Sequence, residues 1–251
     1  MFLTNLSMAA MRVYTTYSTR SNDVGYGIYL IIFLAIMILP LIAHFNVTST
    51  FKKYSAVRNS RGLTADQVAR MILDANGLYN VSIEHIRGNL SDHYDPKANV
   101  VRLSDAVFGQ TSVAAIGVAA HECGHACQHA EEYKPILIRS KLVPVTNFCS
   151  YTWYILFFIG AALSQLTIGT SLIYISIILF LAVIVFQIVT LPCEFNASSR
   201  ALKTLEQDNI LETAEIPQAR KVLTAAALTY VTSLVVSVLQ LLRLLLSVRR
   251  R

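Results

Sequence analysis

The chain has 251 residues, of which 54% are hydrophobic and only 14% are charged, and its formal net charge is +6. Soluble domains carry roughly 25% charged residues, so this composition argues against an ordinary soluble globular protein. No basic stripe with interleaved aromatic residues is present, which argues against a nucleic-acid partner and makes membrane anchoring the better interpretation of the positive charge.

Four long apolar stretches explain this composition, and the sequence predicts that each of them crosses a lipid bilayer. A transmembrane helix needs about 20 predominantly apolar residues, with a working range of roughly 17 to 25. The predicted spans are residues 25–45, 145–166, 169–191 and 225–247, and the second is the shortest. Buried helices of a soluble enzyme are the alternative, but four such runs leave too few polar faces to cover them.

The first apolar stretch is interpreted as a retained anchor rather than a cleavable signal peptide. It is long, begins late in the chain, and lacks a small-residue cleavage site after Phe45. Residues 1–24 are predicted to be an N-terminal tail, with Met8 or Met11 as an alternative start, and residues 248–251 are a basic tail.

Counting the spans places residues 46–144 and 192–224 on one side of the membrane and both chain ends on the other. Lysines and arginines near the membrane are more numerous on the first of these sides, so the positive-inside rule places it in the cytoplasm. The arginines at positions 249–251 count against this orientation. We expect an integral, multi-pass protein of the cell membrane whose soluble part faces the cytoplasm.

The soluble residues 46–144 are expected to contain a helix and a small sheet. The helix begins after Thr64, where Thr64 and Gln67 have the spacing of a capping box. Residues 81–86 and 100–103 are expected to form two short strands around the turn-rich sequence SDHYDPKAN. An exposed strand could bind an extended peptide by adding it to the sheet edge, or it could serve only to pack the domain.

The sequence HECGH at residues 121–125 is an H-E-x-x-H motif, preceded by the apolar run VAAIGVAA that is typical of a buried helix. Residues at positions i and i+4 lie on one face of a helix, so the imidazoles of His121 and His125 can bind one zinc ion. Glu122 lies toward the same side and is expected to act as general base on the metal-bound water. Thr111 or Ser112 is the expected N-cap of this helix.

A catalytic zinc ion usually has three protein ligands, so one more is required. His129 lies about 12 Å along a continuous helix from His121, at about 1.5 Å per residue, and cannot reach the same ion unless the helix breaks. Glu194 follows Pro192 at the end of the third span, where a carboxylate needs a partner, and is the expected third ligand. The alternative is a charge that interacts with a helix N-terminus. Small residues would let the two helices pack closely: Gly117, Ala120, Gly124, Ala197, Ser198 and Ala201.

Four cysteines do not form the pattern of a disulfide framework. Cys123 and Cys127 lie four positions apart on the predicted zinc helix and could in principle bind metal. Reduced thiols that pack as small apolar residues are favoured, in agreement with a reducing cytoplasmic compartment.

The motif HECGH, followed later in the chain by EFNASSRAL, resembles the membrane-embedded zinc metallopeptidases of the gluzincin type. These include the HtpX-like heat-shock proteases and the CAAX prenyl endopeptidases, whose second motif is E-[FY]-x-A-D. The chain is most similar to the bacterial neutral zinc metallopeptidases of the YugP-like family, through QVARMIL, SDHYDP, VRLS, VAAHECGHACQ, VTLPCEFNASSRAL and AALTYV. The resemblance implies that His121, His125 and Glu194 hold zinc and that Glu122 is the base. Ser198 stands where the wider group has aspartate, so a hydroxyl or another group has to orient the histidine.

Together these features predict a mainly α membrane protein with about four transmembrane helices and a small α+β zincin-like cytoplasmic domain that carries the HExxH helix. The expected activity is that of a zinc metallopeptidase with one Zn²⁺ per chain, an endopeptidase that hydrolyses peptide bonds of membrane or membrane-proximal proteins. Candidates for stabilising the oxyanion or orienting a ligand are His93, Tyr94, Arg200 and Ser198.

Two other functions are compatible with the sequence. A non-catalytic membrane protein with a structural zinc site is the first, but such a site has no use for Glu122 and typically has four protein ligands. A small transporter is the second, but the polar residues available within its spans, Gln187, Gln240 and Arg243, lie near the span ends.

Overall fold

The computed structural model describes the backbone of residues 2–249 and the side chains of residues 27–246. The backbone of residues 2–24, predicted to be an N-terminal tail, belongs to helix α1, and the predicted start at Met8 or Met11 stays a prediction. Of the predicted basic tail, residues 250 and 251 lie outside the described part. The elements in chain order are α1 (Phe2–Ser55), α2 (Ala65–Ala75), β1 (Ser82–Ile86), β2 (His93–Asp95), β3 (Val100–Ser104), α3 (Val113–Ala130), α4 (Lys134–Ala162), α5 (Thr167–Gln207) and α6 (Ile216–Arg249).

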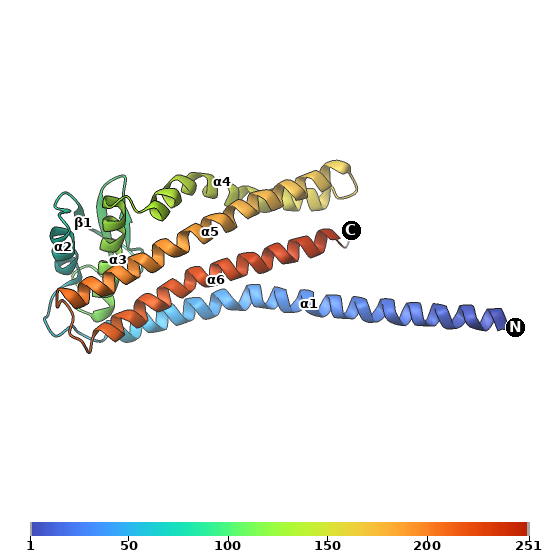
Figure 1. Cartoon of the computed structure of the whole chain (residues 1–251), viewed down its shortest axis with the longest axis horizontal. Coiled ribbons are helices and arrows are strands. Elements are labelled where there is room, and N and C mark those ends of the chain that lie inside the picture. The colour runs from blue at the N-terminus through green and yellow to red at the C-terminus, as the bar shows by residue number, and fades with distance from the viewer. Residues whose placement is uncertain (1, 250–251) are drawn as a thin grey trace.

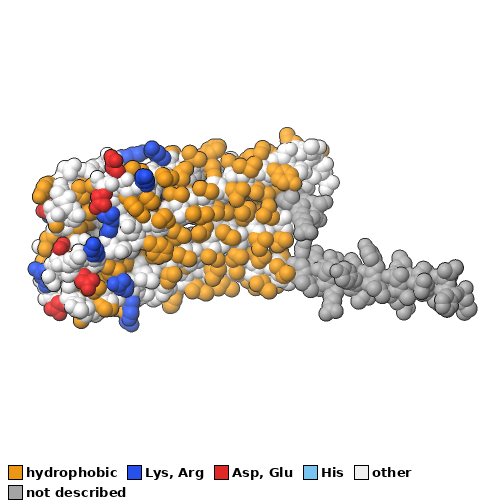
Figure 2. All heavy atoms as spheres, in the orientation of Figure 1, with side chains coloured by type: hydrophobic (Ala, Val, Ile, Leu, Met, Phe, Trp, Pro, Cys, Tyr) orange, Lys and Arg blue, Asp and Glu red, His pale blue; other side chains and the backbone are white. Residues whose placement is uncertain are grey.

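Four helices in the described part of the chain are long and apolar enough to cross a membrane, and they extend from the end of the molecule that holds α2, α3 and the sheet (Figure 1). The candidate spans are Gly27–Ser55, Lys134–Ala162, Thr167–Gln207 and Ile216–Leu246. Apolar side chains cover the long helices in a broad band, and charged side chains gather at the end with the sheet (Figure 2). The prediction of a mainly α membrane protein with four candidate spans is therefore confirmed.

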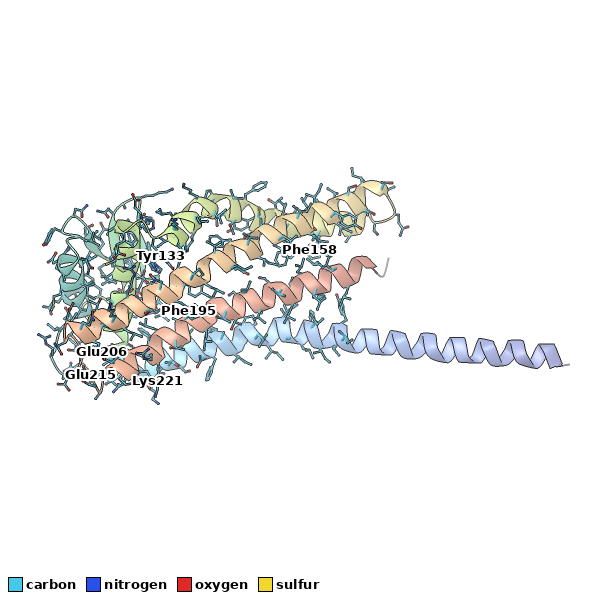
Figure 3. The ribbon with its side chains drawn as sticks, in the orientation of Figure 1. Tyr133, Phe158, Phe195, Glu206, Glu215 and Lys221 are labelled. Atoms are coloured by element: carbon cyan, nitrogen blue, oxygen red, sulfur yellow. The ribbon has the colours of Figure 1, made fainter. Side chains whose placement is uncertain are left out.

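The same polarity is visible in individual side chains (Figure 3). Phe158 and Phe195 are exposed on the long helices, whereas Glu206, Glu215 and Lys221 lie at the end that holds the sheet. The carboxylate of Glu215 is buried and accepts a hydrogen bond of 2.7 Å from the backbone N–H of Ser60. This bond connects the residue before α6 to the segment that follows α1.

The long helices extend beyond the predicted spans. Helix α4 already begins at Lys134, and α5 continues through Pro192 to Gln207 without interruption. Glu194 therefore lies inside a continuous helix, two residues after a proline, and the predicted soluble segment 192–224 begins within that helix. A proline inside a helix removes one backbone hydrogen bond, and this loss is tolerated in spans that are supported by neighbouring helices.

The sheet has three strands in the order β1-β3-β2, where the sequence predicted two. Strand β1 pairs with β3 in parallel, and β2 pairs with β3 in antiparallel fashion. The additional strand β2 has only three residues, too few for an alternating pattern, and side chains fix its position. Arg102 donates a hydrogen bond of 2.7 Å to Asp95, and Asp92 accepts one of 2.6 Å from the N–H of Ser104. These contacts leave β2 at an edge of the sheet.

The hydrophobic core is shared between the segment after α1 and the ends of the long helices. Helix α2 begins with the predicted capping box of Thr64 and Gln67 and packs a buried apolar face against α3. Ala201 and Leu205 of α5 and Leu223 of α6 belong to the same cluster of buried residues. The part of the molecule that holds the sheet is therefore completed by α5 and α6.

Helices α3 and α5 pack closely at Gly124. A Cβ atom at this position would lie 2.9 Å from the backbone oxygen of Ala197 and 3.3 Å from its Cα atom. The predicted close packing of small residues is confirmed at this point. Gly117 instead faces α6, where its nearest neighbour would be the Cβ of Ala219 at 3.7 Å.

Replacing Gly124 with alanine should therefore separate α3 from α5. We expect Gly124→Ala to lower the free energy of unfolding by about 1–3 kcal/mol, because the methyl group meets backbone atoms that cannot rotate away. Thermal unfolding of the purified protein in detergent measures this change. Gly117→Ala on the same helix is the matched control and should be neutral or stabilising, since its methyl group makes an ordinary contact. Equal effects of the two substitutions would contradict the prediction.

Candidate metal centre

Helix α3 carries the HECGH sequence in an unbroken run from Val113 to Ala130. Ser112 is its N-cap, and the Ser112 side chain accepts a hydrogen bond of 3.2 Å from the N–H of Ala115. Most of the helix is buried, because small apolar residues let other elements pack around it. His121 and His125 project from one face, with ring centroids 4.7 Å apart.

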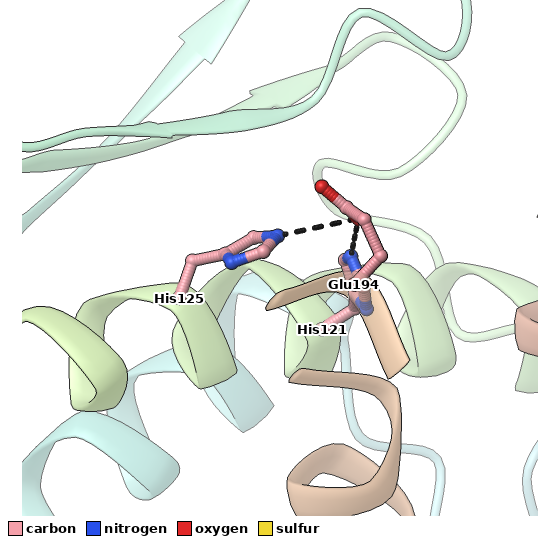
Figure 4. Close-up of side chains that lie close together, drawn as sticks. All are labelled: His121, His125 and Glu194. Carbon is pink, nitrogen blue, oxygen red and sulfur yellow. Dashed lines mark hydrogen bonds and ion pairs between the residues drawn. The ribbon is translucent and has the colours of Figure 1, made fainter. Parts of the chain in front are cut away.

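Glu194 of α5 completes a group with these two histidines (Figure 4). Its Oε2 atom lies 3.2 Å from Nε2 of His121 and 3.6 Å from Nε2 of His125. The three ligand atoms all lie within 4.8 Å of one another, and Glu194 is only 2% exposed. Within the described residues, this is the one group of three His, Cys, Asp or Glu side chains with such geometry.

The donor set fits a zinc ion. Zinc binds histidine nitrogen and carboxylate oxygen at about 2.0–2.2 Å, which places neighbouring ligand atoms of a tetrahedral site roughly 3.3 Å apart. The two distances from Glu194 lie on either side of this value. Oε1 of Glu194 has no hydrogen-bond partner, and its described ion-pair partner is Arg139, with Nη1 at 3.4 Å. A carboxylate buried in this way requires further positive charge, which a metal ion would provide.

Neutral side chains orient both histidines. The Oγ atom of Ser198 lies 3.1 Å from Nδ1 of His121, and Oε1 of Gln128 lies 3.0 Å from Nδ1 of His125. The amide nitrogen of Gln128 donates to the carbonyl oxygen of Cys193 at 2.8 Å and to Oδ1 of Asn196 at 2.9 Å. These bonds fix Oε1 of Gln128 as the acceptor, so Nδ1 of His125 carries the proton and Nε2 is left available for a metal.

The sequence analysis did not identify Gln128. Its position three residues after His125 is the sequence signal that could have identified it, and the structure buries its side chain completely. Residues three apart in a helix are neighbours on its surface, so an amide at this spacing can reach the ring nitrogen.

The charge on His125 depends on two opposing effects. Burial lowers its pKa, but the hydrogen bond with Glu194 and the charges of Glu122 and Glu194 outweigh burial, so the pKa of His125 is raised above its usual value. A metal ion has to displace this proton, because only the neutral imidazole is a ligand.

Glu122 lies beside the metal group but is not part of it. The side chain is 8% exposed, and its Oε2 atom accepts a hydrogen bond of 3.1 Å from the backbone N–H of Tyr94 on β2. The edge strand thus positions the carboxylate that the sequence predicts to be the base. The phenol of Tyr94 is directed elsewhere, since it donates to Oδ1 of Asn99 at 3.1 Å.

The other residues singled out in the sequence lie farther from the metal group. Arg200 forms two bonds of 2.7 Å with the carboxylate of Glu131 and does not line the cavity at the histidines. The Nδ1 atom of His93 lies 2.8 Å from the carbonyl oxygen of Ser91. His129 lines the cavity outside the metal group, and burial together with His125 and Arg139 lowers its pKa.

Two cavities adjoin the metal group. The larger, of about 710 Å³, is lined by β2 and the first part of α4, and the smaller, of about 450 Å³, by α1 and α6. Five residues line both: Asp92, His121, Glu122, Glu194 and Tyr230. We call these five residues the junction.

The cysteines contribute no ligand to this group. All four are free and buried, and burial raises the pKa of the Cys123 thiol well above its usual value. Thiols in such surroundings are protonated and unreactive, and they pack as small apolar side chains.

Comparison with known proteins agrees with this geometry. Residues 29–249 match the model of a family described as "Putative neutral zinc metallopeptidase". Over 216 residues the chain is 49% identical to "Putative membrane protease YugP" of Bacillus subtilis (strain 168). The aligned residues make up 85% of this chain and 94% of that protein. No solved structure matches the chain significantly. These matches confirm the family resemblance that the motifs indicate.

Removal of the carboxylate should abolish metal binding. We expect Glu194→Ala to contain no zinc after purification, because two histidines alone bind zinc weakly and the buried site would lose its only anionic ligand. Elemental analysis of the detergent-purified protein measures the zinc content. His129→Ala is the matched control on the cavity wall and should retain zinc. If His129→Ala lost zinc and Glu194→Ala retained it, His129 rather than Glu194 would be the third ligand.

Loss of the buried amide should weaken zinc binding without abolishing it. Gln128→Leu keeps the side-chain volume but leaves Nδ1 of His125 without its acceptor, so we expect zinc affinity to fall by about 10- to 100-fold. Competition with a chromogenic chelator measures this affinity. Unchanged affinity would show that the surrounding helices hold His125 without the amide.

Proposed function

Because the chain belongs to the neutral zinc metallopeptidase family, we propose that it is a membrane-embedded zinc endopeptidase of the gluzincin type. His121, His125 and Glu194 hold one zinc ion, and Glu122 is the general base. The observation that carries this proposal is the position of Glu194, a buried carboxylate from a long apolar helix that meets both histidines of the motif. Glu122 lies next to this group and lines both of the same cavities.

The chemistry requires proton transfer as well as a metal. When bound, zinc supplies Lewis acidity that polarises a carbonyl group and lowers the pKa of water. Glu122 takes the proton of the attacking water and delivers it to the nitrogen of the leaving amine. One of its oxygens is held by the N–H of Tyr94, which fixes the direction of the carboxylate while the other oxygen exchanges the proton.

The edge strand β2 provides a binding surface for an extended peptide. Its three residues line the larger cavity beside the metal group, and the sheet leaves one side of the strand unpaired. A substrate that adds to this edge would bind the unpaired backbone groups of β2 other than the Tyr94 N–H, which Glu122 already binds, and would pass directly over Glu122. Binding through backbone groups suits an endopeptidase, because every peptide segment carries them.

Substrates are peptides of membrane proteins or of proteins close to the membrane. The walls of both cavities include residues of candidate spans, namely Ser140 and Asn147 of α4, Thr48 of α1 and Ala226 of α6. The positive-inside rule favours a cytoplasmic position for this end of the molecule, where lysine and arginine side chains border the apolar band (Figure 2).

An open metal site favours catalysis over a structural role. Structural zinc sites in proteins are typically closed by four protein ligands, whereas the described group has three and adjoins a cavity of about 710 Å³. A purely structural site would also have no need for a carboxylate at position 122.

The role of Glu122 can be separated from metal binding. We expect Glu122→Gln to retain zinc and to lose hydrolysis of casein by about 100- to 10,000-fold, because the amide cannot accept the proton of water. Cleavage is measured with the zinc-loaded protein in detergent, with and without a chelator. Glu132→Gln, in the exposed turn that follows α3, is the matched control and should cleave at the wild-type rate. If Glu122→Gln were as active as the wild type, Glu122 would not be the general base.

A further inference from the structure

Hydrolysis at this centre needs a hydrogen-bond donor that the sequence analysis did not identify. As water adds to a peptide carbonyl, negative charge develops on the carbonyl oxygen, and preorganised donors aimed at that oxygen contribute strongly to the rate. We propose that the phenol of Tyr230, on α6, is this donor. The inference rests on the proposed endopeptidase function and adds a catalytic residue to it.

The position of Tyr230 follows from the arrangement of the cavities. Tyr230 belongs to the junction, so its side chain lines both the cavity beside β2 and the cavity beside α1. A peptide that occupies both cavities has to cross the junction, which places its central peptide bond beside Glu122 and Tyr230. The scissile carbonyl would therefore lie within reach of the phenol.

Within the junction, Tyr230 is the side chain that is neither a metal-group member, a base nor an acceptor only, and its hydroxyl carries a donor proton within reach of the Glu194 carboxylate. His121 and Glu194 belong to the metal group, and Glu122 is the base. Asp92 is an acceptor, and both of its oxygens already bind Ser104, at 2.6 Å from the backbone N–H and 2.9 Å from the hydroxyl. A phenol is protonated at neutral pH and is a good donor to a developing negative charge.

The donors predicted from the sequence are already engaged or lie outside the junction. The Tyr94 phenol bonds to Asn99, and the Arg200 guanidinium bonds to Glu131. His93 lines only the larger cavity. Arg139 also lines only that cavity, and its guanidinium lies 3.4 Å from Glu194, where it balances the charge of the carboxylate.

Helix α6 holds Tyr230 in a fixed position relative to the motif helix. Ala219 and Leu223 are buried in the core shared with α3, and Ala219 packs against Gly117. Tyr230 follows Ala219 by about three helical turns and so projects from the same face of α6. Its phenol lies within hydrogen-bonding reach of Glu194 and close enough to Glu122 and Arg139 to interact with their charges, so a substrate carbonyl at the junction would compete with Glu194 for the phenol proton. A donor fixed in this way needs no reorganisation during the reaction.

The step balances with Tyr230 as a donor only. The water oxygen bonds to the carbonyl carbon, the π pair moves to the carbonyl oxygen, and the water proton passes to Glu122. When the carbonyl forms again, the carbon–nitrogen bond breaks and Glu122 protonates the amine. Tyr230 keeps its proton throughout and stabilises the oxyanion by a hydrogen bond.

The test compares Tyr230→Phe with the wild type in the full-length, zinc-loaded protein. Phenylalanine keeps the ring and removes the hydroxyl, so the fold is retained and only the donor is lost. We expect kcat on casein to fall by about 100- to 1,000-fold with little change in KM and with full zinc content. Affinity for a phosphonate peptide, which mimics the tetrahedral species, should fall by the same factor as kcat/KM. Tyr174→Phe on α5, whose ring is exposed, is the matched control and should behave as the wild type.

Each outcome distinguishes the inference from the function on which it rests. If Glu122→Gln abolishes cleavage while Tyr230→Phe keeps the wild-type kcat, the endopeptidase function stands and the inference is wrong. Loss of zinc in Tyr230→Phe would make Tyr230 a positioning residue for Glu194 and would likewise overturn the catalytic role. A zinc-loaded wild type that cleaves neither casein nor a membrane protein in vesicles would overturn both proposals.

Discussion

The structure depends on the burial of one carboxylate. Glu194 lies between two helices at 2% exposure, and a buried charge is strongly destabilising unless other charges and hydrogen bonds compensate it. The two histidines and Arg139 provide part of that compensation, and a metal ion held by the same group would add to it. Because all of them have to reach the same two oxygens, α3, α4 and α5 are held in one arrangement at this point.

This arrangement needs helices that approach closely, and their small residues permit it. Gly124 leaves room for the backbone of Ala197, which brings Glu194 and Ser198 of α5 to the face of α3 that carries the histidines. The core continues through α5 and α6 without a boundary between a soluble domain and a membrane domain. The candidate spans are therefore part of the scaffold that holds the metal group.

The sequence predicted the features that depend on local spacing. The HECGH helix, the Thr64 capping box and the four apolar helices all follow from patterns within short segments. Glu194 could be predicted because a charge beside a long apolar stretch is rare. Strand β2 was missed because its three residues are fixed by contacts with β3 rather than by their own pattern.

Some residues around the site were not predicted from the sequence. They share one property: their roles follow from contacts with residues that are distant in the sequence. Gln128 is recognised by its partners on α5, Arg139 by its distance to Glu194, and Tyr230 by the two cavities that it lines. Conversely, Arg200 looked suitable in the sequence because it lies near Glu194, but it projects toward Glu131 on the other side of the helix. Spacing along one helix identifies residues that share a face, whereas contacts between helices depend on how the helices cross.

The order of the elements along the chain has a consequence for biogenesis. The motif helix α3 is translated before α5, which contributes Glu194, and before α6, which contributes Tyr230. Both later helices are long and apolar enough to cross a membrane. A nascent chain at the ribosome thus carries the two histidines and Glu122 without a complete centre. The metal group is therefore complete only after α5 has been made and has packed against α3.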